Sequence, residues 1–527
     1  MKCTFFKGLT PGLLFSIALL TACNWGQKKK DQPQDTITTA KVDSLSRPSA
    51  GETLSTQAYV DGIISRIKAV ERQLPGISAE AAVSLYRSLA LYADTAVAGI
   101  SNNESGWLDK YVNYFSEEKN KVVPPDSVQR AIDLLATAGI EPWGIGEGYT
   151  VLRTVPDFYT RLFKNSLPPD YRSYLQLNAD EDTVLYSADA GLAVPFSHVG
   201  QRALHWEQFV DAYPNSILVA NARENYERYC EDYLFGQDNT PSFDSHQDIS
   251  SLVAENKAEY LSFVQKYGNT RTAGVVKLFL EKVNTEKSVD GLRQIVRNEI
   301  KQLFDERVEL LPAPAGFGAA QIAQLTKPVY DTVPTEAGPD EVVRGLDAIV
   351  YFRLDGNVYC TAVFTNGVPN GGAPATGWMD VWVFKQAGDS WQAVAHQLNA
   401  GGGGMYGNSG YFSGLVKLGT HRIGIMVSGG ITHMGSSISW DDVLAFSNDQ
   451  LTAAFTITTS DAYDNANGIQ HCKFNKWLMR PAGQEENYQL LIISGSCMDG
   501  SLPLEKTIVP FKNGGYNVPE KFLDRGI

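Results

Sequence analysis

Residues 348–365, AIVYFRLDGNVYCTAVFT, decide the fold of the C-terminal half of the chain. Apolar and polar residues alternate on both sides of Asp355-Gly356, a pair typical of a two-residue hairpin turn. The same alternation recurs down the chain in WMDVWVFK (378–385), SWQAVAHQL (390–398), FSGLVKLG (412–419), HRIGIMVSG (421–429), LTAAFTITT (451–459), CKFNKWLM (472–479), YQLLIIS (488–494) and EKTIVPF (505–511). The pattern predicts about ten to twelve short strands, and therefore an antiparallel β domain, sandwich or barrel-like, over residues 341–527.

The N-terminal half has a helical period instead. In AYVDGIISRIKAVERQL (58–74), Ile63, Ile67, Val70 and Leu74 recur at three- and four-residue spacing, which places them on one helix face. Similar segments continue to about residue 308 and predict an all-α domain over residues 57–308. Residues 309–340 are rich in proline, which interrupts regular structure, so we expect a linker there.

The helical half contains one internal sequence repeat. FVDAYPNS (209–216) aligns with FVQKYGNT (263–270), and each copy lies between two amphipathic segments. Phe and Tyr four residues apart extend the apolar face of a helix, Pro or Gly ends it, and Ser or Thr can cap the next helix. This unit resembles the helix–turn–helix repeat of tetratricopeptide-like envelope lipoproteins, which implies an array of helical hairpins.

The N-terminal residues have the pattern of a targeting signal. Lys2 and Lys7 precede an apolar run too short to span a bilayer, and the run ends in Leu20-Thr21-Ala22-Cys23. This motif resembles the lipobox of bacterial lipoproteins. The resemblance implies a signal peptide over residues 1–22, acylation of Cys23, and a lipid anchor with a flexible tether over residues 23–56. Asn24 after the anchor favours the outer membrane, with the body in the periplasm or at the cell surface.

Composition limits the partners and the cysteine chemistry. The 527 residues carry a net charge of -14, which argues against nucleic acid as a partner, and 43% of them are hydrophobic, enough for substantial cores. No Cys-x-x-Cys or Cys/His metal-ligand spacing occurs in the sequence. Cys472 and Cys497 fall on two predicted strands, where they form either a disulfide or two buried thiols.

The glycine-rich stretch GGGMYGNS (402–409) has the spacing of a phosphate-binding loop, but Asn408 stands where that loop requires lysine. The flanking segments alternate like strands, so no helix follows to present its N-terminus to a phosphate. The sequence therefore predicts a loop between two strands. Met405, Tyr406 and Tyr411 are its candidate ligand contacts, and exposed backbone amides are the alternative means of binding.

A second candidate ligand site lies in the helical half, within EPWGIGEGYTVLRTVPDFYTRLF (141–163). Trp143, Glu147, Tyr149 and Arg153 combine aromatic and charged side chains beside glycines, a mixture found in concave ligand sites. The simpler interpretation is an aromatic-rich loop between helices.

No catalytic motif, metal site or cofactor-binding motif emerges from the sequence. We therefore expect a membrane-anchored envelope lipoprotein that works as a binding or scaffold protein rather than as an enzyme, with a protein or glycan partner. The alternative is an envelope hydrolase acting on glycan or peptide, with a carboxylate-based site between the two halves, since carboxylate hydrolases need no local sequence signature.

Overall fold

A computed structural model describes residues 54–245, 247–333, 336–337, 340–465, 468–481, 486–496 and 503–523. The proposed signal peptide, Cys23 and most of the proposed tether lie outside these residues. Eleven α-helices occur in the described part of the chain: α1 (Thr56–Gln73), α2 (Ala79–Leu108), α3 (Asp126–Thr137), α4 (Phe158–Phe163), α5 (Pro169–Glu181), α6 (Phe196–Ala212), α7 (Val219–Phe235), α8 (Ala254–Tyr267), α9 (Arg271–Lys282), α10 (Val289–Gln302) and α11 (Ala319–Tyr330).

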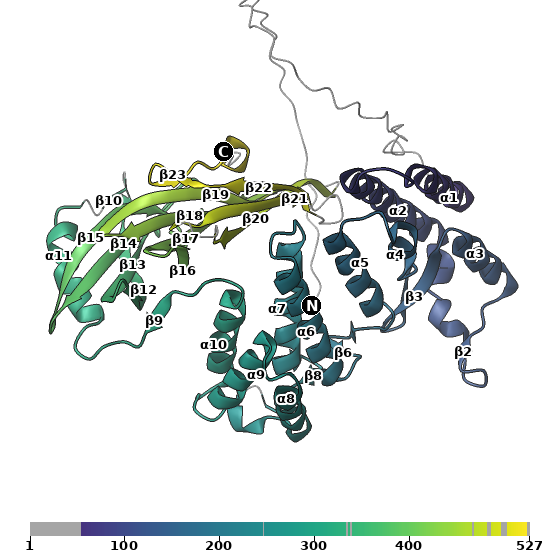
Figure 1. Cartoon of the computed structure of the whole chain (residues 1–527), viewed down its shortest axis with the longest axis horizontal. Coiled ribbons are helices and arrows are strands. Elements are labelled where there is room, and N and C mark those ends of the chain that lie inside the picture. The colour runs from purple at the N-terminus through teal and green to yellow at the C-terminus, as the bar shows by residue number, and fades with distance from the viewer. Residues whose placement is uncertain are drawn as a thin grey trace, which may run out of the picture. The chain divides into compact units, whose positions relative to one another are not determined.

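The two copies of the internal repeat form two helical hairpins, as predicted, one from α6 and α7 and the other from α8 and α9 (Figure 1). In the second copy the hydroxyl of Thr270 accepts a hydrogen bond of 3.1 Å from Ala273 N and so caps α9. In the first copy Ser216 lies two residues before the cap position, Leu218, whose N–H donates to the Ser216 hydroxyl at 3.0 Å. The turn sequence is therefore used differently in the two hairpins.

The helical half is not all-α, which corrects the sequence-based prediction. Four two-stranded antiparallel sheets lie between its helices: β1 (Phe115–Ser116) with β2 (Lys121–Val122), β3 (Ile140–Gly146) with β4 (Tyr149–Thr154), β5 (Ser187–Ala188) with β6 (Gly191–Leu192), and β7 (Gly236–Gln237) with β8 (Thr240–Pro241). The segment interpreted as an interhelical loop is the β3–β4 hairpin. Its turn residues Glu147 and Gly148 both have positive φ, 50° and 82°, which tight hairpin turns require.

The C-terminal half consists mainly of two antiparallel sheets (Figure 1). The five-stranded sheet has the order β15-β14-β13-β12-β9, and the seven-stranded sheet runs from β16 to β22 in sequence order. The strands of the first sheet are β9 (Glu309–Leu311), β12 (Val343–Leu354), β13 (Asn357–Gly367), β14 (Trp378–Ala387) and β15 (Ser390–Gly401). Those of the second are β16 (Tyr411–Gly419), β17 (Arg422–His433), β18 (Ser436–Ser447), β19 (Gln450–Asn465), β20 (Gly468–Arg480), β21 (Gln489–Ser496) and β22 (Pro503–Val509).

The predicted hairpin at Asp355-Gly356 is confirmed. These two residues have φ of 50° and 75°, and Leu354 pairs with Asn357 across the turn. The inward faces of the two sheets share one apolar cluster, in which Phe352 and Val383 of the first sheet meet Ile425 of the second. The two sheets therefore pack on a common core.

The helical half and the second sheet are joined by packing and by polar contacts. Leu491 and Ile493 of β21 belong to the main helical core cluster. The Lys476 ammonium of β20 donates hydrogen bonds to Asn221 (3.1 Å) and Glu224 (2.6 Å) of α7. The Pro-rich stretch treated as a linker in the sequence contains regular structure, because it includes β9, α11 and the short strands β10 (Glu336–Ala337) and β11 (Asp340–Glu341).

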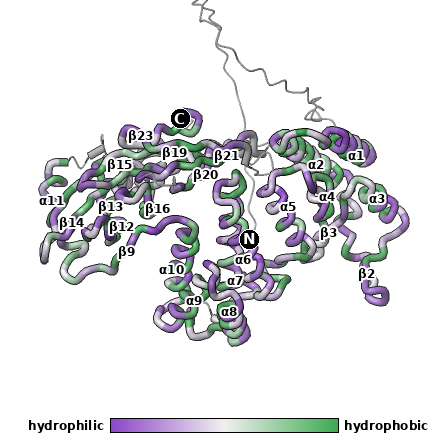
Figure 2. Tube along the Cα trace, in the orientation of Figure 1, coloured by the Kyte–Doolittle hydropathy of each residue, from purple (hydrophilic) through white to green (hydrophobic). Residues whose placement is uncertain are grey.

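Figure 2 shows hydrophilic and hydrophobic residues interleaved along the helices rather than gathered in one long apolar run. Within the described part of the chain, every helix is too short or too polar to pass through a lipid bilayer.

Candidate functional site

The glycine-rich loop 402–410 connects the two sheets. It leaves β15 at the edge of the first sheet and enters β16 at the edge of the second, so the predicted position between two strands is confirmed. We call it the crossover loop. Its glycines are required by close packing, because a Cβ on Gly407 would collide with the Val368 carbonyl oxygen and φ is 76° there.

The backbone amides of the crossover loop are already engaged. Their hydrogen bonds run from Gly402 N to Asp442 Oδ2 (3.0 Å), Gly403 N to Ser409 O (2.9 Å), Gly404 N to Thr376 Oγ1 (3.2 Å) and Gly407 N to Ala375 O (2.8 Å). A phosphate cradle needs several amides directed at the ligand. These four amides are directed at protein oxygens, which removes the physical basis for a phosphate site built from them.

A cavity of about 770 Å³ opens beside this loop, and we call it the crossover cavity. Its volume lies within the range of roughly 300–1,000 Å³ that ligand pockets usually have. The wall comes from the β13–β14 connection, the end of β15, the crossover loop, β17 and β18. The side chains that give it chemical character are Trp378, Asn399, Met405, Ile431, His433, Trp440 and Asp442.

Trp440 and Asp442 lie deepest in this wall. Trp440 is only 4% exposed and Asp442 only 7%. The Asp442 carboxylate accepts hydrogen bonds from Gly402 N and from the Thr456 hydroxyl, the latter at 2.5 Å, so it holds the start of the crossover loop against β19. A buried carboxylate with fixed geometry is thus presented to an otherwise largely apolar cavity.

The sequence analysis missed β18, the strand that carries these two residues. Asp441 and Asp442 stand in its middle, and aspartate is depleted in strands because it competes for backbone hydrogen bonds. In the structure Asp441 is satisfied by the Ser428 hydroxyl (2.6 Å) and by the Trp477 indole N–H (2.8 Å). The alternation of Ile438 and Trp440 before the acidic pair was the available signal.

The three residues predicted for the loop divide into two groups. Met405 lines the crossover cavity. Tyr406 and Tyr411 are both 61% exposed, and they stand on the outer surface of the loop and at the start of β16. Of the predicted contacts, only Met405 belongs to the cavity wall.

The residues predicted in the helical half all lie on the β3–β4 hairpin, where Trp143 and Arg153 contact each other. The Arg153 guanidinium lies 3.5 Å from the centroid of the Trp143 ring and forms an ion pair with Glu141 at 2.8 Å. Tyr149 is 65% exposed, and Glu147 is in the turn. A cation on an aromatic face, paired with a carboxylate, braces a hairpin and needs no ligand to explain it.

A second cavity, of about 540 Å³, lies between α2, α4 and α5 in the helical half. Asp94 and Asp182 both line it. Burial raises the pKa of each carboxyl group, and at Asp182 the guanidinium groups of Arg153 and Arg202 oppose the rise. Carboxyl groups with raised pKa in a cavity are typical of sites of proton transfer, although structural sites also produce them.

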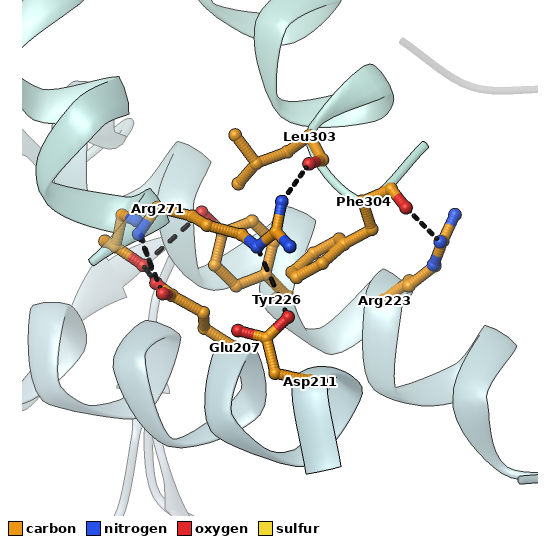
Figure 3. Close-up of polar contacts among 8 residues, drawn as sticks. Glu207, Asp211, Arg223, Tyr226, Arg271, Leu303 and Phe304 are labelled. Atoms are coloured by element: carbon orange, nitrogen blue, oxygen red, sulfur yellow. Dashed lines mark hydrogen bonds and ion pairs between the residues drawn. The ribbon is translucent and has the colours of Figure 1, made fainter. Parts of the chain in front are cut away.

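A polar cluster at the junction of α6, α7 and α9 stabilises the packing of these helices. Glu207 accepts hydrogen bonds from Arg271 N (2.7 Å), Thr272 N (2.8 Å) and the Thr272 hydroxyl (2.5 Å), and Figure 3 shows its carboxylate beside Arg271. The 4%-exposed carboxylate of Glu207 thus caps the first turn of α9, where the helix dipole favours negative charge. The Arg271 side chain binds Asp211 and the Leu303 carbonyl oxygen, at 3.2 and 2.9 Å.

A partly buried arginine at the end of β20, Arg480, has fewer such contacts. Arg480 Nε and Nη2 have no hydrogen-bond acceptor among the described residues. Burial and, to a smaller extent, the neighbouring Arg223 lower the pKa of Arg480 to about 10, against the opposing effect of Asp305. Asp305, the carboxylate that raises the pKa of Arg480, is itself engaged by Arg223 in an ion pair of 2.8 Å. The charge of Arg480 is therefore poorly compensated.

The described cysteines include both free thiols and a disulfide-bonded residue. Cys230 and Cys360 are free thiols buried in the helical core and in the first sheet. Cys472 is disulfide-bonded. Cys497 lies outside the described residues, so the pairing of Cys472 with Cys497 stays a prediction.

Among the described residues no cluster of three or more His, Cys, Asp or Glu side chains is arranged to hold a metal ion. No protein-family model, no curated protein and no solved structure matches this chain. Its function must therefore be argued from the two cavities and from the sequence.

Proposed function

We propose that this chain is a lipid-anchored binding protein of the bacterial cell envelope, and that its ligand occupies the crossover cavity. One observation carries the proposal: two tryptophans, a methionine and an isoleucine surround a buried carboxylate in a cavity of about 770 Å³. Apolar walls with a few fixed polar groups are the usual composition of a ligand site.

The packing around the cavity supports a preformed site. Asp442 is fixed by two hydrogen bonds, and the crossover loop is bonded to the β13–β14 connection and to β17, the latter through Gly430 N and Gly403 O at 3.0 Å. A cavity that is already ordered loses little conformational entropy when a ligand binds. A binding role therefore requires no large rearrangement of these walls.

We also propose how the two sheets are arranged around the cavity. Their shared apolar cluster favours a β-sandwich, in which the crossover loop passes from one layer to the other. The cavity then lies at the end of the sandwich where the chain changes sheets. Loops at the ends of such sandwiches often carry binding sites, because the strands hold them in fixed positions.

Filling the cavity tests the binding role. Ala373 lines the cavity and is half-buried, so Ala373→Trp places an indole ring in the ligand space without changing the core. We expect a library of small molecules and oligomers to include compounds that raise the melting temperature of the full chain, and we expect Ala373→Trp to abolish those shifts. Shifts that persist in a folded Ala373→Trp protein would place binding elsewhere and refute the assignment.

The anchor is tested separately. Cells given an alkyne-labelled fatty acid should incorporate the label into the wild-type chain and not into Cys23→Ser, and the variant should leave the membrane fraction. Equal labelling of the two proteins would contradict acylation at Cys23. This experiment addresses the location of the protein and is independent of the cavity.

A second function rests on the cavity that Asp94 and Asp182 line. Their raised pKa values favour a hydrolase in which one carboxyl group donates a proton. The full chain should then hydrolyse purified peptidoglycan or labelled casein, and Asp94→Asn should lose that activity while the exposed Asp109→Asn keeps it. Absence of hydrolysis by the folded wild-type protein would eliminate this candidate.

A further inference from the structure

The crossover cavity also indicates the chemical class of its ligand. We propose that it binds a neutral carbohydrate chain, with a sugar ring stacked on Trp378 and hydroxyl groups directed toward Asp442. This inference rests on the proposed function, because it specifies the ligand of the same cavity.

Charge excludes anionic ligands first. The ionisable side chains that line the cavity are Asp442 and His433, and the lining contains neither lysine nor arginine. A phosphate, a uronic acid or a fatty-acid carboxylate would lie near the Asp442 carboxylate, and the lining supplies no lysine or arginine to balance the charge of such a ligand. Burying like charges without a partner costs several kcal/mol, so the ligand must be neutral or cationic at the end that enters.

Among neutral ligands, the aromatic and polar side chains of the cavity wall favour a carbohydrate. Trp378 is half-buried at the start of β14, so part of its ring remains open to the cavity. An indole face provides a large, rigid area for contact with the C–H groups on one face of a sugar ring. Sugar hydroxyls can at the same time donate to the Asp442 carboxylate and exchange hydrogen bonds with Asn399 and His433.

An acyl chain fits this wall less well. It would cover the exposed side chains of Asn399 and His433, which would lose their hydrogen bonds to water without gaining others from the chain. A polar group buried without a compensating hydrogen bond costs about 1–3 kcal/mol, which offsets much of what the apolar contact gains. The polar groups in the wall thus disfavour a purely hydrophobic ligand.

A peptide also finds few partners. Bound peptides usually pair their backbone carbonyl groups with free N–H groups of the receptor. The crossover-loop amides of Gly402, Gly403 and Gly404 already donate within the fold. A sugar hydroxyl, which both donates and accepts, matches the remaining side-chain groups better than an amide does.

The surroundings of the cavity favour a chain over a single sugar. Tyr406 and Met434 directly follow the lining residues Met405 and His433, and they are 61% and 85% exposed. Exposed aromatic and apolar side chains at such positions extend the contact area beyond the cavity. A carbohydrate chain that emerges from the cavity can therefore stack on these residues as well.

Binding of defined oligosaccharides tests the proposal. The full lipidated chain is purified in a polyoxyethylene detergent, which contains no sugar, and titrated with neutral glucan, mannan, xylan, galactan and N-acetylglucosamine oligomers. Calorimetry and tryptophan fluorescence should detect at least one of them. Trp378→Ala should weaken binding at least tenfold, Trp378→Phe should retain part of it, and Tyr149→Ala in the helical half should stay within twofold of wild type.

The other outcomes separate the two proposals. If a uronic-acid oligomer, a fatty acid or a peptide binds in a Trp378-dependent manner and no neutral oligosaccharide does, the carbohydrate inference is overturned and the binding role survives. If a neutral oligosaccharide binds equally to wild type and to folded Trp378→Ala, the inference is also overturned. If no probe of any class binds, and the compound library gives no shift either, both proposals fail.

Discussion

Replacing Glu207 tests whether the polar cluster of Figure 3 stabilises the helical half. The 4%-exposed carboxylate accepts hydrogen bonds from two backbone N–H groups and one hydroxyl group at the start of α9. A hydrogen bond to a charged group contributes about 1.5–3 kcal/mol. Glu207→Gln keeps one carbonyl acceptor but turns an NH₂ group toward the remaining donors, so we expect the free energy of unfolding to fall by about 2–3 kcal/mol.

Glu207→Ala leaves all three donors without this acceptor and adds a small cavity, and we expect a loss of about 4–5 kcal/mol. Urea denaturation followed by far-ultraviolet circular dichroism measures both losses. Glu281→Gln is the matched control, because that side chain is 69% exposed and pairs with Lys282 only at 3.5 Å. Its effect should stay within about 0.5 kcal/mol. An equally small effect of Glu207→Gln would refute the capping role.

Three further predictions concern charge and cysteine chemistry. Arg480→Met should leave the free energy of unfolding unchanged or raise it by about 1–3 kcal/mol in urea denaturation, because it removes a poorly compensated, partly buried charge; a clear loss would reveal a partner for Arg480. The bond at Cys472 should contribute about 3–4 kcal/mol if it closes on Cys497, so reductant should lower the melting temperature of wild type and not of Cys472→Ser, and non-reducing peptide mapping should recover the linked pair. Burial raises the pKa of the Cys360 thiol to about 12 and that of Cys230 still further, so mass spectrometry should find both unlabelled by iodoacetamide at neutral pH until the protein is unfolded.

Periodicity was sufficient to predict most of the architecture. The three- and four-residue spacing around Ile63 predicts α1, and the alternation around Asp355-Gly356 predicts the β12–β13 hairpin, because each pattern records which face of an element is buried. The β3–β4 hairpin was missed for a physical reason. Its Pro142 and glycines lower the strand propensity, and only the positive φ values of Glu147 and Gly148 allow the chain to turn there.

The candidate site was harder to predict, because its wall is assembled from segments far apart in the chain. Met405 was found through the unusual glycine spacing, but the same spacing suggested phosphate chemistry that the engaged amides do not support. Trp378 lies on a predicted strand, yet nothing local to it indicates a cavity. Asp442 was obscured because its stabilising contacts, Gly402 N and the Thr456 hydroxyl, come from other strands and loops.

The crossover loop has a consequence for the order in which this protein matures. The carbonyl oxygens of Gly403 and Gly407 accept hydrogen bonds from Gly430 N, which follows the loop, and from Val368 N, which precedes it, so the loop reaches its final form only after both sheets are paired and docked. Contacts between residues so far apart in the chain form late in folding, because the entropy of closing the long loop must be lost before the contacts that compensate this loss can form. A ligand of the crossover cavity will therefore recognise only fully folded copies, and at a concentration of 100 times its dissociation constant it would protect them from unfolding by about 2.7 kcal/mol. Occupancy of the cavity would thus distinguish completely folded molecules from partly folded ones.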